Sequence, residues 1–320
     1  MCCVSNILNY IIRTNWSIII ENAFEWDIKT QQVILGAFYY GYFVTPILGG
    51  WLVGKYGGFY VLFIASTMSS LIALFSPFTA RCGISPLVIS RIFDGFAQGL
   101  GYVSTMGIIR KWAKLNERST FVSISTSGYS AGAIVSSYVS PLLITSPIFG
   151  GWPSTFYIFG ITGIIWCLCW WIVGSSDVTS NRWVSEFEKE SIKESQSKGM
   201  QTTEVDRVNW KELAMSAPVL SISVFFVGID FGLYLLSADI PIFFETILQF
   251  DIKMSGYLLS VAQFVYFIAI IFGGVVADKL INHTEISKIH IRKLFVSFLG
   301  LQSILLILIG YVHHVWIAAL

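Results

Sequence analysis

The chain has 320 residues, of which 55% are hydrophobic, 16% aromatic and only 12% charged, and its formal net charge is +1. Soluble domains average about 25% charged residues, so a soluble protein of this size could not bury so much apolar surface. The mean hydropathy of +0.70 agrees. The composition excludes a soluble enzyme, a nucleic-acid-binding protein and a disordered scaffold, and it predicts a polytopic protein whose solvent is the lipid bilayer.

Long apolar runs predict an all-α membrane protein with about nine helices. A membrane-spanning helix needs about 20 mostly apolar residues. Some of the runs are free of Asp, Glu, Lys and Arg, and three others embed a few charged residues. The predicted spans cover residues 4–21, 30–54, 56–80, 86–109, two within 119–176 joined by a turn at 141–153, then 213–239, 254–277 and 294–320.

The placement of the basic residues predicts the orientation. With the N-terminus in the cytoplasm, 15 basic residues lie in cytoplasmic loops and three lie opposite, namely Lys29, Arg81 and Lys253. Cytoplasmic loops carry an excess of Lys and Arg, so this asymmetry supports both the span count and the orientation. We therefore expect a multi-pass protein with a cytoplasmic N-terminus.

A polar, charge-dense segment separates two groups of spans. Residues 177–212 follow six predicted helices, and we interpret them as a cytoplasmic linker, either with some amphipathic helix or as a solvated loop. The chain then divides into an N-terminal six-helix bundle (1–176), the linker (177–212) and a partial C-terminal bundle (213–320).

An internal repeat supports this division. The second span ends at Gly49-Gly50 and continues to Lys55 and Gly57, while the span at 254–277 contains Gly273-Gly274 and leads to Asp278 and Lys279. Both motifs come second in their bundle and lead into a basic turn. Two parallel six-helix halves joined by a linker resemble the plan of the major facilitator superfamily. We expect this fold, with a complete N-terminal bundle and an incomplete C-terminal one.

Several strings resemble the anion/phosphate symporter family, solute carrier family 17, which includes sodium–phosphate/urate-type transporters, sialin and the vesicular glutamate transporters. The strings recur in the family's order and spacing from about residue 8 onward. They include Tyr10-x-x-Arg13-x-Asn15-x-Ser17, Gly36-Ala-Phe-Tyr-Tyr-Gly41-Tyr42, Arg91-x-x-x-Gly95-x-x-Gln98-Gly99, Gly151-Trp152-Pro153 with Phe156-Tyr157-Ile158-Phe159-Gly160, and Ile291-Arg292-Lys293.

The resemblance implies a secondary active transporter of small organic or inorganic anions that works by alternating access. Gln98 and the Gly-Trp-Pro string favour phosphate-, urate- or sialate-like substrates over glutamate. An acidic residue stands at position 98 in the glutamate branch and is linked there to proton sensing. Of the possible coupling ions, Na⁺ or H⁺, we therefore expect Na⁺ or the membrane potential to drive transport. The plasma membrane or a lysosomal or vesicular membrane is the implied location.

Two arginines within spans are the first candidates for substrate contact. A guanidinium is costly in the bilayer, and its planar fork suits carboxylate and phosphate. Arg13 is the stronger candidate; Arg91 either binds the anion or pairs with Asp94, which lies three residues on along the same helix face. Gln98 and Tyr102 lie on the same helix face as Arg91. They either line a cavity or form hydrogen bonds with neighbouring helices.

Three further residues complete the candidate site. Asn15 accompanies Arg13 and binds either the substrate or a neighbouring helix, and Tyr234 matches a family tyrosine that can face the substrate. Asp230 is a candidate coupling residue, because a carboxylate within a membrane span can carry a proton or pair with an arginine. We expect Gly50, Lys55, Gly57, Asp278 and Arg292 to form turn motifs that act in conformational change.

The sequence carries no motif of an enzyme, a metal site or a bound cofactor. We expect a small anionic substrate and the bilayer as partners, and no nucleic acid. The family has twelve helices, so we expect this chain to be either a fragment or a truncated product. The alternative function is a non-transporting paralogue that binds or regulates a full-length transporter.

Overall fold

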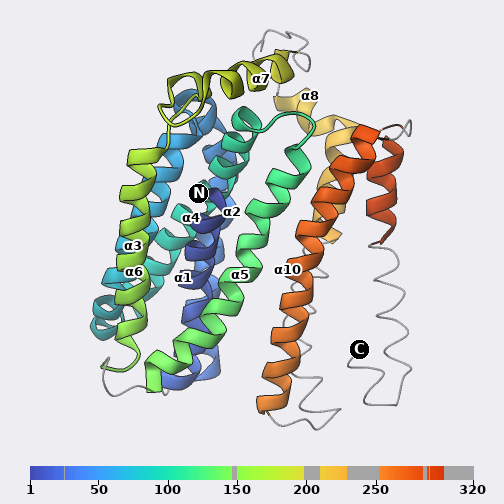
Figure 1. Ribbon diagram of the computed structural model, residues 1–320. Helices are drawn as coiled ribbons and strands as arrows, with labels where there is room; N and C mark the ends of the chain where they lie inside the picture. The colour runs from blue at the N-terminus through green and yellow to red at the C-terminus, as the bar shows by residue number, and fades with distance from the viewer. Residues whose placement is uncertain are drawn as a thin grey trace, which may run out of the picture. The chain divides into compact units, whose positions relative to one another are not determined.

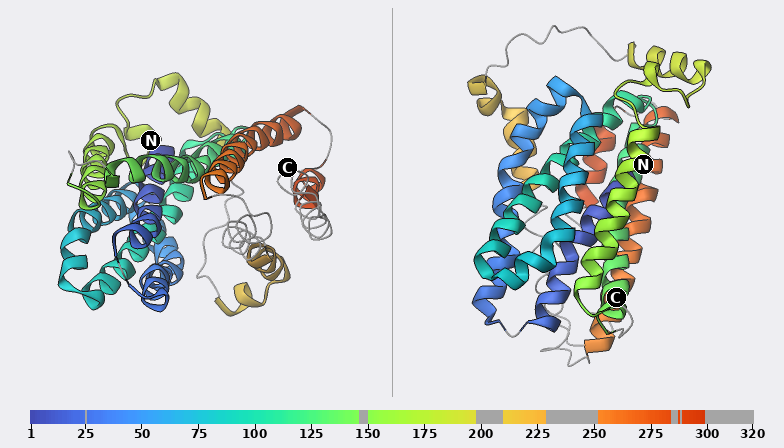
Figure 2. Two further views of the ribbon diagram at one scale, coloured as in Figure 1. Left: turned by 90° about the horizontal axis from the view of Figure 1, so that it is seen from below. Right: turned by 90° about the vertical axis from the view of Figure 1, so that its left-hand side faces the viewer.

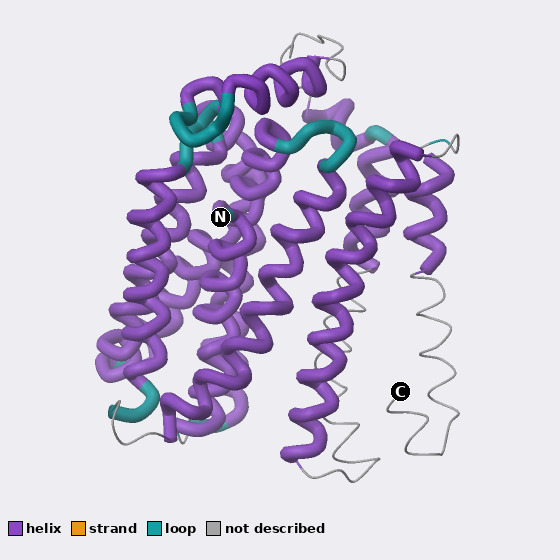
Figure 3. The backbone as a smooth tube through the Cα atoms, viewed as in Figure 1, coloured by secondary structure: helices purple, strands orange, loops and turns teal. Residues whose placement is uncertain are grey.

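The computed structural model describes residues 1–24, 26–145, 150–197, 210–228, 252–283, 287 and 289–298. Within these ranges every regular element is a helix, and the loops between them are short (Figure 3). The chain divides into two compact units: Met1–Gln196 with Gln263–Asp278, and Ser197–Ala262 with Lys279–Leu320. The prediction of an all-α protein is confirmed for the described residues.

Six long helices run side by side through the first unit (Figures 1 and 2). Each corresponds to one of the first six predicted spans, and each has the length that a bilayer crossing requires. Single glycines with positive φ, Gly57 at 84° and Gly83 at 126°, make the two tightest turns. The helices are α1 (Cys2–Ala23), α2 (Ile28–Tyr56), α3 (Gly58–Cys82), α4 (Ile84–Trp112), α5 (Arg118–Thr145) and α6 (Pro153–Val173).

The helices of the bundle differ in polarity. Within the described residues, α2, α3, α6 and the segment Val261–Asn282 are long and apolar enough to cross a membrane on composition alone. Helices α1, α4 and α5 fall outside this group, and each of them carries buried polar residues, among them Asn15, Arg91, Asp94 and Ser136. Polar groups inside a bilayer face the protein interior, so these three helices direct their polar side chains inward.

Small residues allow α2 and α4 to pack with their backbones in contact. A Cβ atom added at Gly95 would overlap the carbonyl oxygen of Phe38, and one added at Gly41 would overlap the carbonyl oxygen of Ile92. One added at Gly99 would lie 2.8 Å from Cβ of Thr45. Small residues at helix interfaces permit such close approach in membranes. This contact sets the register between α2 and α4.

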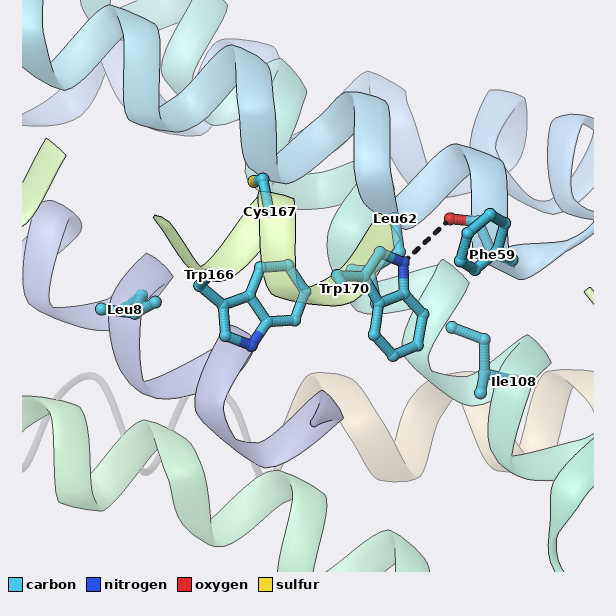
Figure 4. Packing of buried hydrophobic residues seen from close by; sticks show 7 residues of the cluster. All are labelled: Leu8, Phe59, Leu62, Ile108, Trp166, Cys167 and Trp170. Atoms are coloured by element: carbon cyan, nitrogen blue, oxygen red, sulfur yellow. Dashed lines mark hydrogen bonds between the residues drawn. The ribbon is translucent and has the colours of Figure 1, made fainter. Parts of the chain in front are cut away.

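Aromatic side chains fill the other interfaces of the bundle. Trp166 and Trp170 of α6 stack with ring centroids 5.5 Å apart, and they pack against Leu8 of α1 and Phe59 of α3 (Figure 4). The indole nitrogen of Trp170 donates a hydrogen bond of 3.3 Å to the carbonyl oxygen of Phe59. A buried indole N–H normally finds such a partner. This cluster holds α6 against α1 and α3.

The segment after α6 folds back onto the end of α4. It contains the short 3₁₀ helix η2 (Val178–Ser180) and α7 (Glu186–Ser197). The backbone N–H of Leu115 donates to Oγ of Ser195 at 3.0 Å, and Lys111 pairs with Asp177 at 3.0 Å. The first part of residues 177–212 therefore contains a helix, while the interpretation of the whole segment as a cytoplasmic linker stays a prediction.

The second unit is described in part. It contains α8 (Trp210–Met215), a helical stretch at 217–228, part of α10 (Ile252–His283) and a helical stretch at 289–298. Helix α10 confirms the predicted span at 254–277. The predicted spans at 213–239 and 294–320 lie only partly within the described residues. The predicted boundaries at 176 and 212 remain predictions.

The contact between α2 and α4 generates a matched pair of variants. Gly95→Ala forces the two backbones apart, so we expect it to lower the free energy of unfolding by about 1–3 kcal/mol. Gly36→Ala on α2 meets open space, so we expect it to be neutral or to stabilise by up to about 1 kcal/mol. Thermal unfolding in detergent measures both, and equal melting temperatures for the two variants would contradict this packing.

Candidate functional site

Helix α4 carries a buried ion pair. Nη1 of Arg91 lies 3.2 Å from Oδ2 of Asp94, and the two residues are 3% and 1% exposed. Their i, i+3 spacing places both on one helix face. A buried charge is tolerated when it is paired and hydrogen-bonded, and both conditions hold for this carboxylate.

Two neutral side chains complete the surroundings of Asp94. Oδ1 accepts a hydrogen bond of 2.8 Å from the hydroxyl of Ser69 on α3 and one of 3.0 Å from the amide of Gln98. The same amide lies 3.4 Å from Oγ of Ser69. The carboxylate therefore joins α3 to α4 and receives donors on both oxygens. Nε of Arg91, in contrast, is buried with no hydrogen-bond partner in the described part of the chain.

Arg13 of α1 lies among aromatic rings. Its guanidinium carbon is 4.8 Å from the ring centroid of Phe38 and 5.5 Å from that of Tyr10, and Nη2 donates a hydrogen bond of 3.1 Å to the hydroxyl of Tyr39. The rings of Tyr39 and Tyr42 lie 5.2 and 5.7 Å away. A cation over aromatic faces is stabilised electrostatically, and more strongly where water is excluded.

The ring of Phe38 contacts both arginines. The guanidinium carbon of Arg91 is 5.1 Å from its centroid, against 4.8 Å for Arg13. Two cations from α1 and α4 thus meet on one ring of α2. An arginine pair on facing helices can clamp an anion, because each guanidinium supplies several N–H donors. The two predicted arginines are therefore neighbours, as an anion site requires.

The other predicted contacts divide between this cluster and other interfaces. Gln98 belongs to the cluster through Asp94. Asn15 is fully buried, and its amide donates a hydrogen bond of 3.0 Å to Thr155 of α6, which is the second of the two roles expected for it. Tyr102 is 36% exposed, and its ring centroid lies 6.4 Å from that of Tyr129. Tyr234 and Asp230 lie outside the described residues.

Sequence reasoning missed four groups of this site. They are Phe38, Ser69, Tyr10 and Tyr129; Phe38 and Ser69 are common residues in apolar helices, and nothing local marks these two as neighbours of a charge. Tyr129 lies 5.7 Å from Tyr10, centroid to centroid, and extends the aromatic wall onto α5. A partial signal existed: Tyr10 precedes Arg13 by three residues, so the two share a helix face.

The expected turn residues lie in the last two turns of α2 and α10, in the turn after α2 and in the helical stretch at 289–298. Asp278 is buried, and its carboxylate accepts hydrogen bonds from the backbone N–H groups of Ser119 (3.1 Å) and Thr120 (2.7 Å), in the first turn of α5. Gly57 makes the turn between α2 and α3. Lys55 is exposed over the ring of Trp51, while Gly50 faces open space and Arg292 is exposed.

Across the described ranges, no group of three or more His, Cys, Asp or Glu side chains is arranged to hold a metal ion. The chemistry of the described site is therefore that of guanidinium, carboxylate, amide and phenol groups.

The contact of Asp278 with α5 generates a second prediction. A carboxylate at a helix N-terminus satisfies free N–H groups and interacts favourably with the helix dipole. We expect Asp278→Ala to lower the free energy of unfolding by about 0.5–2 kcal/mol. Asp278→Asn keeps one acceptor oxygen, so it should lower the free energy of unfolding by less than Asp278→Ala does. Thermal unfolding of the three proteins checks this order, and a larger loss for Asn than for Ala would contradict it.

Comparisons with known proteins agree with this architecture. Vesicular glutamate transporter 3 of Danio rerio is 31% identical over 97% of this chain and 53% of its own length. Sialin of Homo sapiens is 30% identical over 90% of this chain and 58% of its own. The chain thus spans little more than half the length of these relatives. The relationship agrees with the expected resemblance and with the expectation that the protein is not an enzyme.

Solved structures and family membership complete the comparison. The proton:xylose symporter XylE bound to 6-bromo-6-deoxy-D-glucose has the same fold, with a TM-score of 0.59 at 17% identity, covering 88% of this chain and 68% of that one. The family described as Major Facilitator Superfamily matches residues 2–320. The protein is an integral membrane protein and belongs to the major facilitator superfamily.

Proposed function

We propose that this protein is a secondary active transporter of small organic or inorganic anions, which it moves by alternating access. The observation that carries the proposal is the meeting of Arg13 and Arg91 on the ring of Phe38, inside a bundle of membrane-spanning helices. Intramembrane arginines mark ion and substrate pathways, because their cost is tolerated only where they have a function or a partner. The names of the relatives, which include glutamate transporters and sialin, support an anionic substrate.

Phosphate, urate and sialate are the anions we propose for this site. All carry oxygen atoms that accept hydrogen bonds from a guanidinium. The aromatic rings around Arg13 favour a substrate with an apolar or planar body, which can lie against them. We propose Arg13 as the main contact, with Arg91, Gln98 and Tyr102 as further contacts and Asn15 in support. Tyr234, which lies outside the described residues, is a further proposed contact on the ground of its sequence position alone.

A cation gradient, of Na⁺ or H⁺, is the proposed energy source. An anion that enters a cell against the membrane potential meets a cost of about 2.3 kcal/mol per charge for each 100 mV. A co-transported cation removes this cost. The turn motifs would then stabilise one of the alternating states, as the contact of Asp278 with α5 illustrates.

We propose the plasma membrane or a lysosomal or vesicular membrane as the location, with a cytoplasmic N-terminus. The distribution of basic residues supports this orientation. Accessibility of single cysteines to an impermeant reagent, with Cys82 at the end of α3 as an internal reference, measures it directly.

Uptake by proteoliposomes tests the proposed function. The probes are radiolabelled phosphate, urate and N-acetylneuraminate, supplied with Na⁺ and pH gradients together. A hydrogen bond to a charged group contributes about 1.5–3 kcal/mol, and we take its loss as a loss of substrate-binding free energy. We therefore expect Arg13→Gln to raise KM by about tenfold to a hundredfold. Arg81→Gln, at the exposed end of α3, should leave KM unchanged.

The outcomes separate the two candidate functions. An unchanged KM for Arg13→Gln would contradict the role of this residue. If the wild-type chain moves no anion but co-purifies with a full-length relative, the protein is a binding or regulatory paralogue instead. Size-exclusion profiles of each variant confirm that loss of uptake is not loss of folding.

A further inference from the structure

We propose that Cys3 carries a long-chain fatty acyl group as a thioester, and that the acyl chain lies in an apolar cavity at the end of the bundle where α1 begins. The inference goes beyond the proposed transport function, because it concerns a covalent modification and holds for any transported anion. Two observations carry it. Thiols line the cavity, and its wall includes a large apolar side chain that is mostly exposed.

The cavity lies among helix ends that are far apart in the sequence. Its lining comes from the first residues of α1, the last turns of α4 and α6, the start of α5 and the segment that follows α6. Helix α7 lies over the same end of the bundle (Figure 1). The volume is about 380 Å³, within the range of about 300–1,000 Å³ typical of ligand pockets. Among the described residues that line it, none is Asp, Glu, Lys, Arg or His, so the ligand that fits is apolar.

Polar groups of the lining are occupied by hydrogen bonds within the wall. The indole nitrogen of Trp170 donates to the carbonyl oxygen of Phe59, which is outside the lining. The amide of Asn181 donates to the carbonyl oxygen of Val173 at 3.0 Å, and its Oδ1 accepts from the backbone N–H of Trp183 at 2.8 Å. These bonds fix the segment after α6 to the end of α6. The wall is therefore preformed, and it offers mainly apolar surface to a ligand.

An apolar ring of this wall is exposed. Trp183 is 70% exposed although it lines the cavity, and Val173 beside it in the lining is 40% exposed. Trp183 belongs to the charge-dense segment outside the predicted spans, where the surrounding solvent is water. Exposed apolar surface that borders a pocket is typical of a binding site. An acyl chain that entered the cavity would cover this ring.

The two thiols of the lining differ in their surroundings. Cys2 packs against the cluster that contains Leu8 and Trp170, whereas Cys3 is not part of that cluster. Both are free thiols and partly exposed. Cysteines beside the ends of membrane-spanning helices are typical sites of S-acylation. Cys3 is therefore the more available nucleophile, and Cys2 contributes to the wall that the acyl chain contacts.

The acyl donor is a fatty acyl-coenzyme A thioester. The thiol of Cys3 loses its proton, and its sulfur attacks the carbonyl carbon of the donor. A bond forms between Sγ and that carbon, the bond from the carbon to the sulfur of coenzyme A breaks, and coenzyme A leaves as a thiol that carries the proton. Such donors are cytoplasmic. The basic turn between α4 and α5, which holds Lys114, lies at this end and supports its exposure to the cytoplasm.

Metabolic labelling tests the modification. The full chain is expressed in eukaryotic cells fed an alkyne-tagged palmitate analogue, and the label is measured before and after neutral hydroxylamine, which cleaves thioesters. We expect labelled wild-type protein that loses the label in hydroxylamine. Cys3→Ser should lose the label. Cys2→Ser, its neighbour, and Cys82→Ser, at the end of α3, should keep it.

Thermal unfolding in detergent tests where the acyl chain lies. Hydroxylamine should lower the melting temperature of the labelled wild type by a few degrees, because the cavity loses its apolar contents, and should leave that of Cys3→Ser unchanged. In Trp183→Ser this shift should shrink, because the chain loses one side of its cavity. Phe187→Ser changes an exposed aromatic residue of α7 that does not line the cavity, so the shift should equal that of the wild type.

Each result decides the proposal. Unlabelled wild-type protein would overturn it, and so would a label that Cys2→Ser removes and Cys3→Ser keeps. A label that resists hydroxylamine would indicate a lipid held without a covalent bond, which also overturns it. An unchanged melting temperature after cleavage would place the acyl chain outside the cavity. None of these results bears on uptake by the Arg13 variant, so the transport proposal is tested separately.

Discussion

The structure of the bundle depends on one buried ion pair, that of Arg91 with Asp94. Either charge alone would be too costly to bury among membrane-spanning helices. Even when the two are paired, the remaining lone pairs of the Asp94 carboxylate need hydrogen-bond donors. Ser69 and Gln98 supply these donors. The pair thereby fixes the position of α3 against α4. It also places the guanidinium of Arg91 at the ring of Phe38, which the guanidinium of Arg13 contacts as well.

Close packing makes this arrangement possible. Gly41 and Gly95 bring α2 and α4 together until their backbones touch. At that separation the ring of Phe38 on α2 lies 5.1 Å from the guanidinium carbon of Arg91 on α4. Glycines that seem to serve packing alone therefore also position the candidate site. The arrangement of the candidate site follows from the register of its helices as much as from its charged residues.

Much of this could be predicted from sequence, for physical reasons. Apolar runs bounded by basic turns predict the first six helices, because a bilayer imposes their length. The pairing of Arg91 with Asp94 follows from helical spacing, since both lie on one helix. Contacts between helices could not be predicted in this way. The donation from Ser69, the ring of Phe38 and the orientation of Asn15 toward Thr155 depend on relative register and rotation, which no local pattern encodes.

A double-mutant cycle on the ion pair tests this account most directly. The proteins are wild type, Arg91→Gln, Asp94→Asn and the double variant, and the measurement is thermal unfolding in detergent without substrate. Each single change leaves a buried charge unpaired, so each should destabilise by about 3–5 kcal/mol, whereas the double variant should recover most of that loss. Losses that simply add in the double variant would show that the two residues act independently, which would contradict the account.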